Sequence, residues 1–332
     1  MTFLYCESID RIEVPFNRAF IHGGKEIKSK EIAILNIRDQ DGNLFQGEIG
    51  PFRGVHQETL SQIDFSQLIN RRFSISPVDQ WDLTQPCFGQ DLPMDQVSLQ
   101  SAWEQVLFAH KLHSESLSPE GVVHLASLIN LKDPKFQDRI KGFLDRGYGT
   151  FKIKLGRESF AEELKKLSRC VDLLKSDSKI RVDGNRHFSS EELGKIESLL
   201  GSNLDFVEDP WSFGSKMHKS HINLRIGIDE DLSQALKGEP SNKLIYVVKP
   251  MKFGLSAIFN LISRGVSNSQ IVLSSCFDSG IATGCYLDLI CFLNLSAAHG
   301  LGPYDYLVEN KRLKELPLDQ GILQWKGSSH EL

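Results

Sequence analysis

Residues 150–155 read Thr-Phe-Lys-Ile-Lys-Leu, a short run in which apolar and cationic side chains alternate. Alternation with a period of two is typical of a β-strand that buries one face. Similar apolar runs precede and follow this one, separated by longer helix-like stretches, which predicts repeated βα units on a parallel sheet. The other expected strands are Val122–Ile129, Ile180–Asp183, Phe206–Glu208, Ile226–Asp229, Leu244–Lys249 and Ile271–Ser274.

The number of these runs predicts a closed barrel. Seven strands within roughly 150 residues, with an eighth expected near Tyr304–Val308, suit a barrel better than an open doubly wound sheet. No Gly-x-Gly-x-x-Gly motif follows a strand, which argues against dinucleotide binding. The expected fold class is α/β, a modified (β/α)7β TIM-like barrel over residues 117–315.

The first third of the chain has a different pattern, typical of an α+β domain. Short runs rich in β-branched residues surround a turn signal at Asp41-Gly42-Asn43, which predicts a small antiparallel sheet. The strands are expected within residues 3–14, 30–37 and 44–49, and helices near 57–70 and 97–114.

Domain boundaries follow from where these two patterns meet. The interval 71–96 contains three prolines and is expected to be a loop. An N-terminal α+β domain is therefore predicted over residues 1–116. The tail, about 316–332, contains a strand-like stretch and is expected to return to that domain.

Composition excludes several classes of function. The 332 residues carry a net charge of −5 with no concentrated Lys/Arg block, so a nucleic-acid partner is not expected. No apolar run reaches membrane-spanning length and no export signal is recognisable, so we expect a soluble, cytoplasmic protein without a membrane partner. Six cysteines without a Cys-x-x-Cys pair indicate reduced thiols. Monomer and homo-oligomer both remain open.

Three acidic residues stand where successive expected strands end. Asp183, Glu208 and Asp229 are spaced 25 and 21 residues apart, each interval close to one βα unit. Because the carboxyl ends of barrel strands meet at one opening, the three carboxylates would converge. Their repulsion would be relieved by a hard divalent cation with oxygen ligands, with Mg²⁺ as the expected ion and Mn²⁺ as an alternative. Taken singly, each acid is better explained as a turn or helix-cap residue, and only their order and spacing favour a joint site.

Lysines flank the acids in the same order. Lys152 and Lys154 lie two residues apart on one expected strand and therefore share a face, and Lys249 follows Asp229 by 20 residues. Lys249 would face the pair across the opening. We expect mutual repulsion to lower the pKa of the paired lysines, since a lysine accepts a proton only in its neutral form.

These residues resemble the enolase superfamily, in its muconate-lactonizing-type subgroup. That subgroup has Lys-x-Lys on the second barrel strand, metal-binding acids on the third to fifth, and a lysine on the sixth. Within it, Gly47–Thr59, Arg181–Arg186 and Leu273–Gly280 resemble segments of the o-succinylbenzoate synthase family. The departures from those segments are Gly184 for Ala, Arg53 for Pro, Cys276 for Ser and Asp278 for Glu.

The resemblance implies a carbon–oxygen lyase of menaquinone biosynthesis with an N-terminal capping domain. Its reaction would be the metal-dependent syn elimination of water from 2-succinyl-6-hydroxy-2,4-cyclohexadiene-1-carboxylate, giving o-succinylbenzoate through an enediolate. Lys154 is the expected base and later acid, Lys152 tunes it, and Lys249 stabilises the enediolate or the ring face by a cation–π contact. Sites of the enolase superfamily combine a lysine or histidine base with Mg²⁺ in this way.

Further site residues are expected around this centre. Asn185 and Glu230 would orient metal ligands or Lys249, although ordinary capping explains them equally well. Ser274 and Ser275 would bind a substrate carboxylate through hydroxyls and backbone amides, with a helix N-cap as the alternative. Gly23 and Arg53 belong to two glycine-containing loops that resemble those closing over the substrate in this superfamily.

Two other kinds of function are compatible with the same residues. The first is a different reaction on the same scaffold: N-succinylamino acid racemase, dipeptide epimerase or muconate cycloisomerase. An epimerase usually shows Asp-x-Asp near strand eight, where this chain has Tyr304-Asp305-Tyr306. The second is a non-catalytic barrel whose acids only bind a structural metal.

Overall fold

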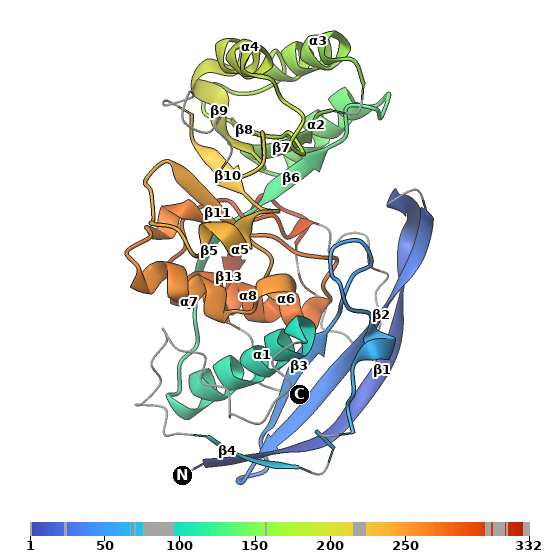
Figure 1. Ribbon diagram of the computed structural model, residues 1–332, viewed down its shortest axis with the longest axis vertical. Helices are drawn as coiled ribbons and strands as arrows, with labels where there is room; N and C mark the ends of the chain where they lie inside the picture. Colours follow the sequence, from blue (N-terminus) through green and yellow to red (C-terminus); the bar gives the residue numbers. More distant parts are fainter. Residues whose placement is uncertain are drawn as a thin grey trace.

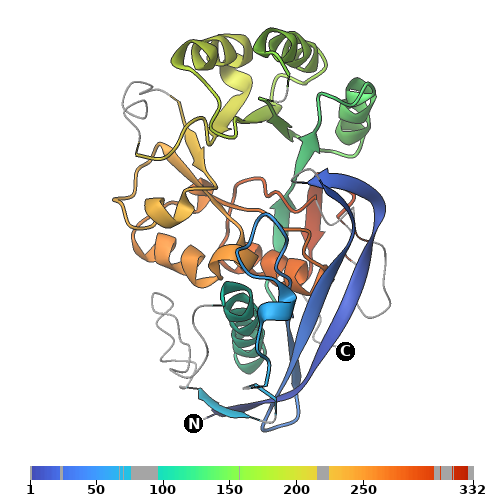
Figure 2. The ribbon, with the colours of Figure 1, turned by 45° about the vertical axis from the view of Figure 1, so that its right-hand side comes forward.

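The computed structural model describes residues 2–22, 25–66, 68–69, 71–75, 96–156, 158–214, 224–302, 307, 316 and 318–327 (Figure 1). It consists of an N-terminal antiparallel sheet with one long helix, and a larger part in which parallel strands alternate with helices (Figure 2). Within the described ranges, no helix combines the length and the apolar character needed to cross a bilayer. The predicted fold class is confirmed.

The N-terminal domain is a four-stranded antiparallel sheet in the order β3-β2-β1-β4, with α1 packed on one face. Apolar residues at alternate positions of β2, among them Leu35 and Ile37, share a buried cluster with Trp103 and Val106 of α1. The helix expected near 57–70 is only one 3-10 turn. The elements are β1 (Thr2–His22), β2 (Lys25–Asp39), β3 (Leu44–Ile49), η1 (Leu60–Gln62), β4 (Arg72–Ile75) and α1 (Val97–Ser114).

The larger part is a seven-stranded parallel sheet in the order β12-β11-β10-β9-β8-β7-β6, so that each strand lies beside its neighbour in sequence. Helices pack on its outer side (Figures 1 and 2). The strands are β6 (Ala126–Ile129), β7 (Thr150–Lys154), β8 (Lys179–Asp183), β9 (Leu204–Glu208), β10 (Ile226–Ile228), β11 (Leu244–Val248) and β12 (Ile271–Leu273). The helical segments are α2 (Phe136–Asp145), α3 (Phe160–Val171), α4 (Ser190–Leu200), η3 (Gly201–Asn203), α5 (Leu232–Ala235), α6 (Pro250–Phe253), α7 (Ser256–Ser263), η5 (Asn268–Gln270) and α8 (Gly280–Phe292).

The sheet is closed into a barrel by two residues, His299 and Gly300. Ala126 N–H donates to His299 O at 2.8 Å on the β6 side, and Gly300 N–H donates to Leu273 O at 2.8 Å on the β12 side. The closing segment therefore precedes the eighth strand expected near Tyr304–Val308. Of that expected strand, only Leu307 is described, and it bridges Phe16 of β1 instead.

The closing histidine is fully buried and neutral. Leu273 N–H donates to His299 Nδ1 at 3.0 Å, which leaves the proton on Nε2, 3.4 Å from Leu295 O. Burial lowers the pKa of His299 to about 3. Protonating this ring would place a charge inside the barrel seam and remove the acceptor of the Leu273 amide.

We therefore expect the barrel to lose stability as the pH falls through the ordinary histidine range. The unfolded chain binds a proton at position 299 near pH 6.5 while the folded chain does not, so this contribution is present above about pH 6.5 and declines below it. Urea unfolding at a series of pH values, compared with His299→Asn, measures the effect, because an asparagine oxygen still accepts the amide. The variant is expected to be less stable at neutral pH but to show a flatter decline between about pH 6.5 and 5. Parallel curves for the two proteins would contradict the prediction.

The described residues of the C-terminal tail pair with the barrel part. Strand β13 (Ile322–Trp325) pairs antiparallel with β5 (Gly121–His124), the first half of the long run expected at 122–129. Trp325 Nε1 donates to the buried carboxylate of Asp288 on α8 at 2.7 Å. In the described part of the tail, β13 therefore extends the segment that leads into β6, and the expected pairing with the first domain is not seen there.

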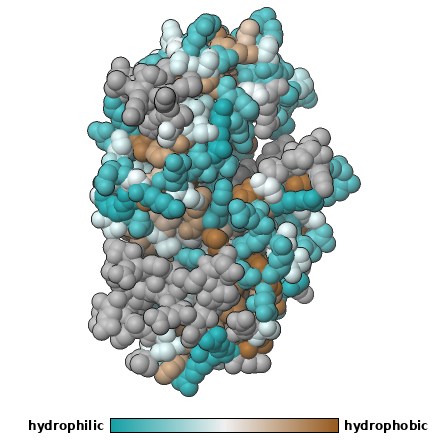
Figure 3. All heavy atoms as spheres, viewed as in Figure 1, coloured by the Kyte–Doolittle hydropathy of each residue, from teal (hydrophilic) through white to brown (hydrophobic). Residues whose placement is uncertain are grey.

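Buried carboxylates of the N-terminal domain bind the starts of two barrel helices. Glu104 of α1 accepts hydrogen bonds from Ser256 N–H at 3.0 Å and Ser256 Oγ at 2.8 Å at the start of α7. Glu48 of β3 accepts from Ser279 N–H at 2.9 Å and from its hydroxyl at 2.5 Å at the start of α8. Helix N-termini favour such anions, so these contacts join the domain to the barrel. On the face shown in Figure 3, the described residues are mainly hydrophilic, with apolar residues in scattered patches.

Candidate active site

Strand alternation brings the predicted site residues to the inner face of the barrel. Phe206, Ile245, Val247 and Val272 form one buried cluster, distinct from the cluster that contains the residues facing the helices. Because residues two apart in a strand share a face, Glu208, Lys249 and Ser274 also lie on that inner face, at the carboxyl ends of their strands. The same parity applies to β7, where Phe151 and Ile153 face the helices and the two lysines beside them face inward.

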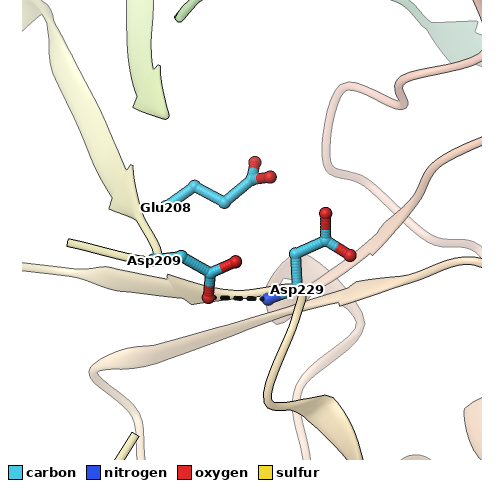
Figure 4. Close-up of side chains that lie close together, drawn as sticks. All are labelled: Glu208, Asp209 and Asp229. Atoms are coloured by element: carbon cyan, nitrogen blue, oxygen red, sulfur yellow. Dashed lines mark hydrogen bonds between the residues drawn. The ribbon is translucent and has the colours of Figure 1, made fainter. Parts of the chain in front are cut away.

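The acidic side chains meet at this end of the sheet. Asp183 pairs in register with Glu208, and Asp229 directly follows β10, whose Gly227 pairs with Glu208. Single carboxylate oxygens of Glu208, Asp209 and Asp229 lie within 4.8 Å of one another. Figure 4 shows that the carboxylates of Glu208 and Asp229 extend into the same space, while Asp209 lies to one side, bonded to the Asp229 amide.

The carboxylate of Asp209 binds backbone amides. Its two oxygens accept hydrogen bonds from Asp229 N–H at 3.2 Å and Glu230 N–H at 3.0 Å, so this carboxylate fixes the turn that carries Asp229. Asp183 is instead joined to Glu208 through an ammonium group, because Lys152 Nζ contacts both carboxylates. This arrangement agrees with a structural role for Asp209 and keeps Asp183 as the third candidate ligand.

The lysines neutralise the acids in this structure. Lys152 Nζ contacts Glu208 Oε1 and lies 3.1 Å from Asp183 Oδ2, and Lys154 Nζ lies 3.5 Å from the same Asp183 oxygen. Lys249 Nζ contacts Asp229 Oδ2 from the opposite side of the acid cluster. Positive groups thus flank the carboxylates from β7 on one side and from the end of β11 on the other.

Burial and charge shift the acid pKa values in different directions. Burial, reinforced by the neighbouring acids, raises the pKa of Glu208 to about 7 despite Lys152. Burial also acts to raise the pKa of Asp183 and Asp229, but it is outweighed by Lys152 and Lys154 for the first and by Lys249 for the second, so both are lowered. Asp183 and Asp229 are therefore held in the ionised form by their lysines, whereas Glu208 is the acid of this cluster that binds a proton most readily.

The expectation that mutual repulsion lowers the pKa of the paired lysines is wrong for Lys152. Burial acts to lower this pKa, but the carboxylates of Glu208, Asp183 and Asp229 outweigh it and raise the pKa above the ordinary lysine value. Lys249 behaves in the same way, with Asp229 as the main partner. The surrounding carboxylates therefore decide the direction of the pKa shift. The spacing of two lysines in the sequence does not reveal these carboxylates.

The residues present fit a divalent cation. All the converging donors are carboxylate oxygens, the ligands that Mg²⁺ prefers. Asp229 Oδ1 is buried and accepts no hydrogen bond from the described residues, an arrangement that is costly for a carboxylate unless a cation or water satisfies it. A cation held by Asp183, Glu208 and Asp229 would meet this oxygen.

Asn185 and Glu230 are both exposed and act through their backbone here. Asn185 N–H donates to Asp183 Oδ1 at 3.3 Å from a left-handed conformation with φ of 44°. Glu230 N–H binds Asp209, and its carboxylate lies 3.5 Å from Lys252 Nζ, a different lysine from the expected Lys249. The structure thus brings Asn185 to a candidate ligand but places the Glu230 side chain at the rim.

The two serines differ in orientation, and their amides are already paired. Ser274 N–H donates to Val248 O at 2.9 Å and Ser275 N–H to Gly300 O at 3.0 Å, so neither amide is free for a substrate carboxylate. Parity places the Ser274 side chain on the inner face, whereas Ser275 lies on the helix side, where its buried hydroxyl has no hydrogen-bond partner among the described residues. Two amides in the first turn of α8 are also occupied, because Ile281 N–H donates to Ser279 Oγ and Ala282 N–H donates to Glu48 Oε2.

The predicted loop residues have different outcomes. Gly23 lies outside the described residues. Arg53 is exposed, in a turn that His56 attaches to the barrel. Phe52 N–H donates to His56 Nδ1 at 2.9 Å, and His56 Nε2 lies 3.1 Å from Met251 O, two residues after Lys249. His56 is not among the site residues expected from the sequence. Its position next to the glycine-containing loop is the one sequence feature that could have suggested this contact.

Comparison with known proteins adds the fold family. Neither a protein-family model nor a curated protein sequence matches the chain. Solved structures do match over nearly the whole length. The chain has the enolase-superfamily fold. Similar structures include o-succinylbenzoate synthase from Thermosynechococcus elongatus BP-1 with Mg in its active site, at 19% identity and TM-score 0.67, covering 96% of each chain.

Other enolase-superfamily structures match equally well. Dipeptide epimerase from Enterococcus faecalis V583, complexed with Mg and a dipeptide, aligns at 16% identity and TM-score 0.73 over 98% of each chain. Muconate lactonizing enzyme from Pseudomonas fluorescens aligns at 17% identity and TM-score 0.68, over 92% of this chain and 90% of the other. At these identities the comparisons establish the shared fold, in which the N-terminal α+β domain corresponds to the capping domain.

Proposed function

We propose that this protein is a Mg²⁺-dependent enzyme that removes a proton next to a substrate carboxylate, with Mn²⁺ as an alternative ion. The observation that carries the proposal is the group of Asp183, Glu208 and Asp229 between lysines from β7 and β11. Within that class we infer an o-succinylbenzoate synthase, a carbon–oxygen lyase of menaquinone biosynthesis. We also propose that the capping domain spans residues 1–116 and that the barrel begins at residue 117.

The lysines would carry the proton. Lys154 would take the proton from the carbon next to the carboxylate of 2-succinyl-6-hydroxy-2,4-cyclohexadiene-1-carboxylate. It would then return that proton to the departing hydroxyl, so that the carbon–oxygen bond breaks and water and o-succinylbenzoate form. Lys152, one inward position earlier on β7, would tune Lys154 and hold Asp183 and Glu208 in place.

Negative charge that develops on the carboxylate oxygens must be stabilised. When bound by Asp183, Glu208 and Asp229, the cation would supply Lewis-acid stabilisation of the enediolate. Lys249, fixed by Asp229, would add a positive charge from the opposite side. Ser274, which directly follows β12 on the inner face, would contact substrate through its hydroxyl.

Support for the dehydration comes from three segments of sequence, Gly47–Thr59, Arg181–Arg186 and Leu273–Gly280, which resemble o-succinylbenzoate synthases. One departure has a physical reason: a Cβ at Gly184 would lie 2.6 Å from ring carbons of Phe188, so alanine does not fit here without movement of that ring. A racemase or epimerase is the second candidate, favoured by lysines on both sides of the acids and by the likeness to dipeptide epimerases. It would need Lys154 and Lys249 both to exchange protons.

An assay on the purified protein separates these functions. We expect the cyclohexadiene carboxylate to be converted to the aromatic product in the presence of Mg²⁺. The change in ultraviolet absorbance measures this conversion. We expect EDTA to remove the activity and added Mg²⁺ to restore it. Activity that ignores EDTA would contradict the metal-dependent mechanism. Racemisation of N-succinylamino acids or dipeptides without dehydration would establish the second candidate.

A further inference from the structure

A lysine of the N-terminal domain lies buried against the turn that follows β12. Lys30, on β2, is 4% exposed, and its ammonium group donates to Cys276 O at 3.2 Å and to Phe277 O at 3.1 Å. It also forms an ion pair with Asp278 at 3.1 Å. One side chain from the first domain therefore donates hydrogen bonds to two successive carbonyls of a barrel turn.

The turn needs such support because its backbone is strained. Phe277 adopts φ of 60°, a left-handed conformation that is unfavourable for a residue with a Cβ. Asp278 supports the turn from the other side, because its Oδ2 accepts the Cys276 N–H at 2.9 Å. Glu48 then holds the next residue, Ser279, by its amide and hydroxyl.

The same turn borders the candidate active site. Ser274, two residues before Cys276, directly follows β12, and its N–H donates to Val248 O at 2.9 Å. Because Leu273 pairs in register with Val248, the residue before Lys249, the buried turn begins beside Lys249. Phe277 packs its ring against Phe52 at 4.9 Å and Phe16 at 5.4 Å between ring centroids, which brings both loop-bearing segments of the N-terminal domain to the turn.

We infer that Lys30 is a positioning residue for the active site, which sets the place of Ser274–Phe277 beside Lys249 through the carbonyls of Cys276 and Phe277. The inference rests on the proposed function for its effect on substrate, but its structural part does not. If it holds, losing the Lys30 ammonium releases the turn locally while the barrel stays folded.

The test must separate positioning from charge balance. Removing Lys30 alone would leave the buried Asp278 and Glu48 without their cation, and misfolding could follow. The double variant K30M/D278N removes one charge of each sign, and the asparagine amide oxygen can still accept the Cys276 N–H. Glu48, 3.7 Å from Lys30, keeps its hydrogen bonds from the Ser279 amide and hydroxyl in this variant. Lys30→Gln, whose neutral amide can donate to one carbonyl, is a second variant for use if the double variant does not fold.

Thiol labelling gives a readout that does not depend on turnover. Cys276 is 3% exposed and Cys170, on α3 far along the chain, is 0% exposed, so both should react slowly with iodoacetamide in the native protein. In K30M/D278N we expect Cys276 to label about ten-fold faster or more while Cys170 stays protected, as local opening requires. Glu104→Gln, which alters another contact between the two domains, should leave Cys276 protected.

Substrate kinetics complete the test. We expect K30M/D278N to raise KM for the cyclohexadiene carboxylate about ten-fold or more, in line with the loss of charge-assisted hydrogen bonds that place a binding segment, while Mg²⁺ affinity is unchanged. Protected Cys276 with wild-type KM would show that Lys30 only balances charge, and faster labelling of Cys170 together with Cys276 would show a general loss of stability. Either result overturns the inference. Absence of turnover in the wild-type protein would refute the proposed function instead, while the labelling result would still stand.

Discussion

Lys154→Ala is expected to abolish turnover while Mg²⁺ binding survives. Removing a general base typically costs about 10²- to 10⁴-fold in kcat, because the proton then has no positioned acceptor. The ammonium group of Lys154 lies 3.5 Å from Asp183 and contributes no metal-ligating atom, so the carboxylate cluster should retain its cation. Calorimetric titration with Mg²⁺, beside single-turnover kinetics, measures the two properties on one sample.

Lys249 provides a sharper comparison between the two proposed reactions. In a dehydration it acts as a fixed positive charge, so Lys249→Arg should keep part of the activity that Lys249→Ala loses. In a racemase it must exchange a proton, which arginine does not do at ordinary pH, so both variants should be inactive. Lys252→Ala is the matched control, since that lysine lies nearby but pairs with the exposed Glu230. Full activity of Lys154→Ala would contradict its role as the base, whereas metal binding without turnover in the wild-type protein would support the non-catalytic barrel.

The barrel could be predicted from the sequence because strand alternation is local information. In Phe151–Leu155 the apolar residues pack against helices and the lysines between them face inward, as their spacing indicates. The order of Asp183, Glu208 and Asp229 likewise follows from one strand end per βα unit. These features need only the period of a strand and the usual length of a crossover.

Features that depend on a distant partner could not be predicted in this way. The barrel is closed by His299 and Gly300, a segment too short to show any period, and the expected strand at Tyr304–Val308 came from a longer apolar run nearby. Strand β13 shows the correct alternation, but alternation does not identify its partner, which is β5. The amides of Ser274 and Ser275 were expected to bind a substrate carboxylate. They instead donate to carbonyls on β11 and on the closing segment, and the local sequence does not indicate these acceptors.

Charge is the other quantity that a local pattern does not contain. Lys152 and Lys154 read as a repelling pair in sequence, yet the folded chain surrounds Lys152 with three carboxylates and raises its pKa. Lys30 begins the strand expected over residues 30–37, and nothing in that local pattern indicates its burial against Asp278 from the far half of the chain. In both cases the partner is more than 25 residues away in sequence.

Substitution of the candidate metal ligands is expected to have the second large effect, on cation affinity. Asp183→Asn, Glu208→Gln and Asp229→Asn each remove one negative charge while preserving the shape of the side chain. Because affinity for hard cations depends on the number of charged oxygen ligands, each change should weaken Mg²⁺ binding by about ten-fold or more and lower the metal-dependent rise in Tm. Titration of the three variants with Mg²⁺, with Tm followed in parallel, gives both measurements.

The variant Asp209→Asn tests whether Asp183 or Asp209 is the third metal ligand beside Glu208 and Asp229. Distance alone groups Asp209 with Glu208 and Asp229, whereas its two hydrogen bonds to the amides of Asp229 and Glu230 assign it to the backbone. An asparagine oxygen still accepts one of those amides, so Asp209→Asn should weaken Mg²⁺ binding less than Asp183→Asn does. The reverse order would replace Asp183 by Asp209 in the ligand set. It would also move the cation away from Lys154, the proposed base, because Lys154 contacts Asp183 and not Asp209 in the part of the chain described.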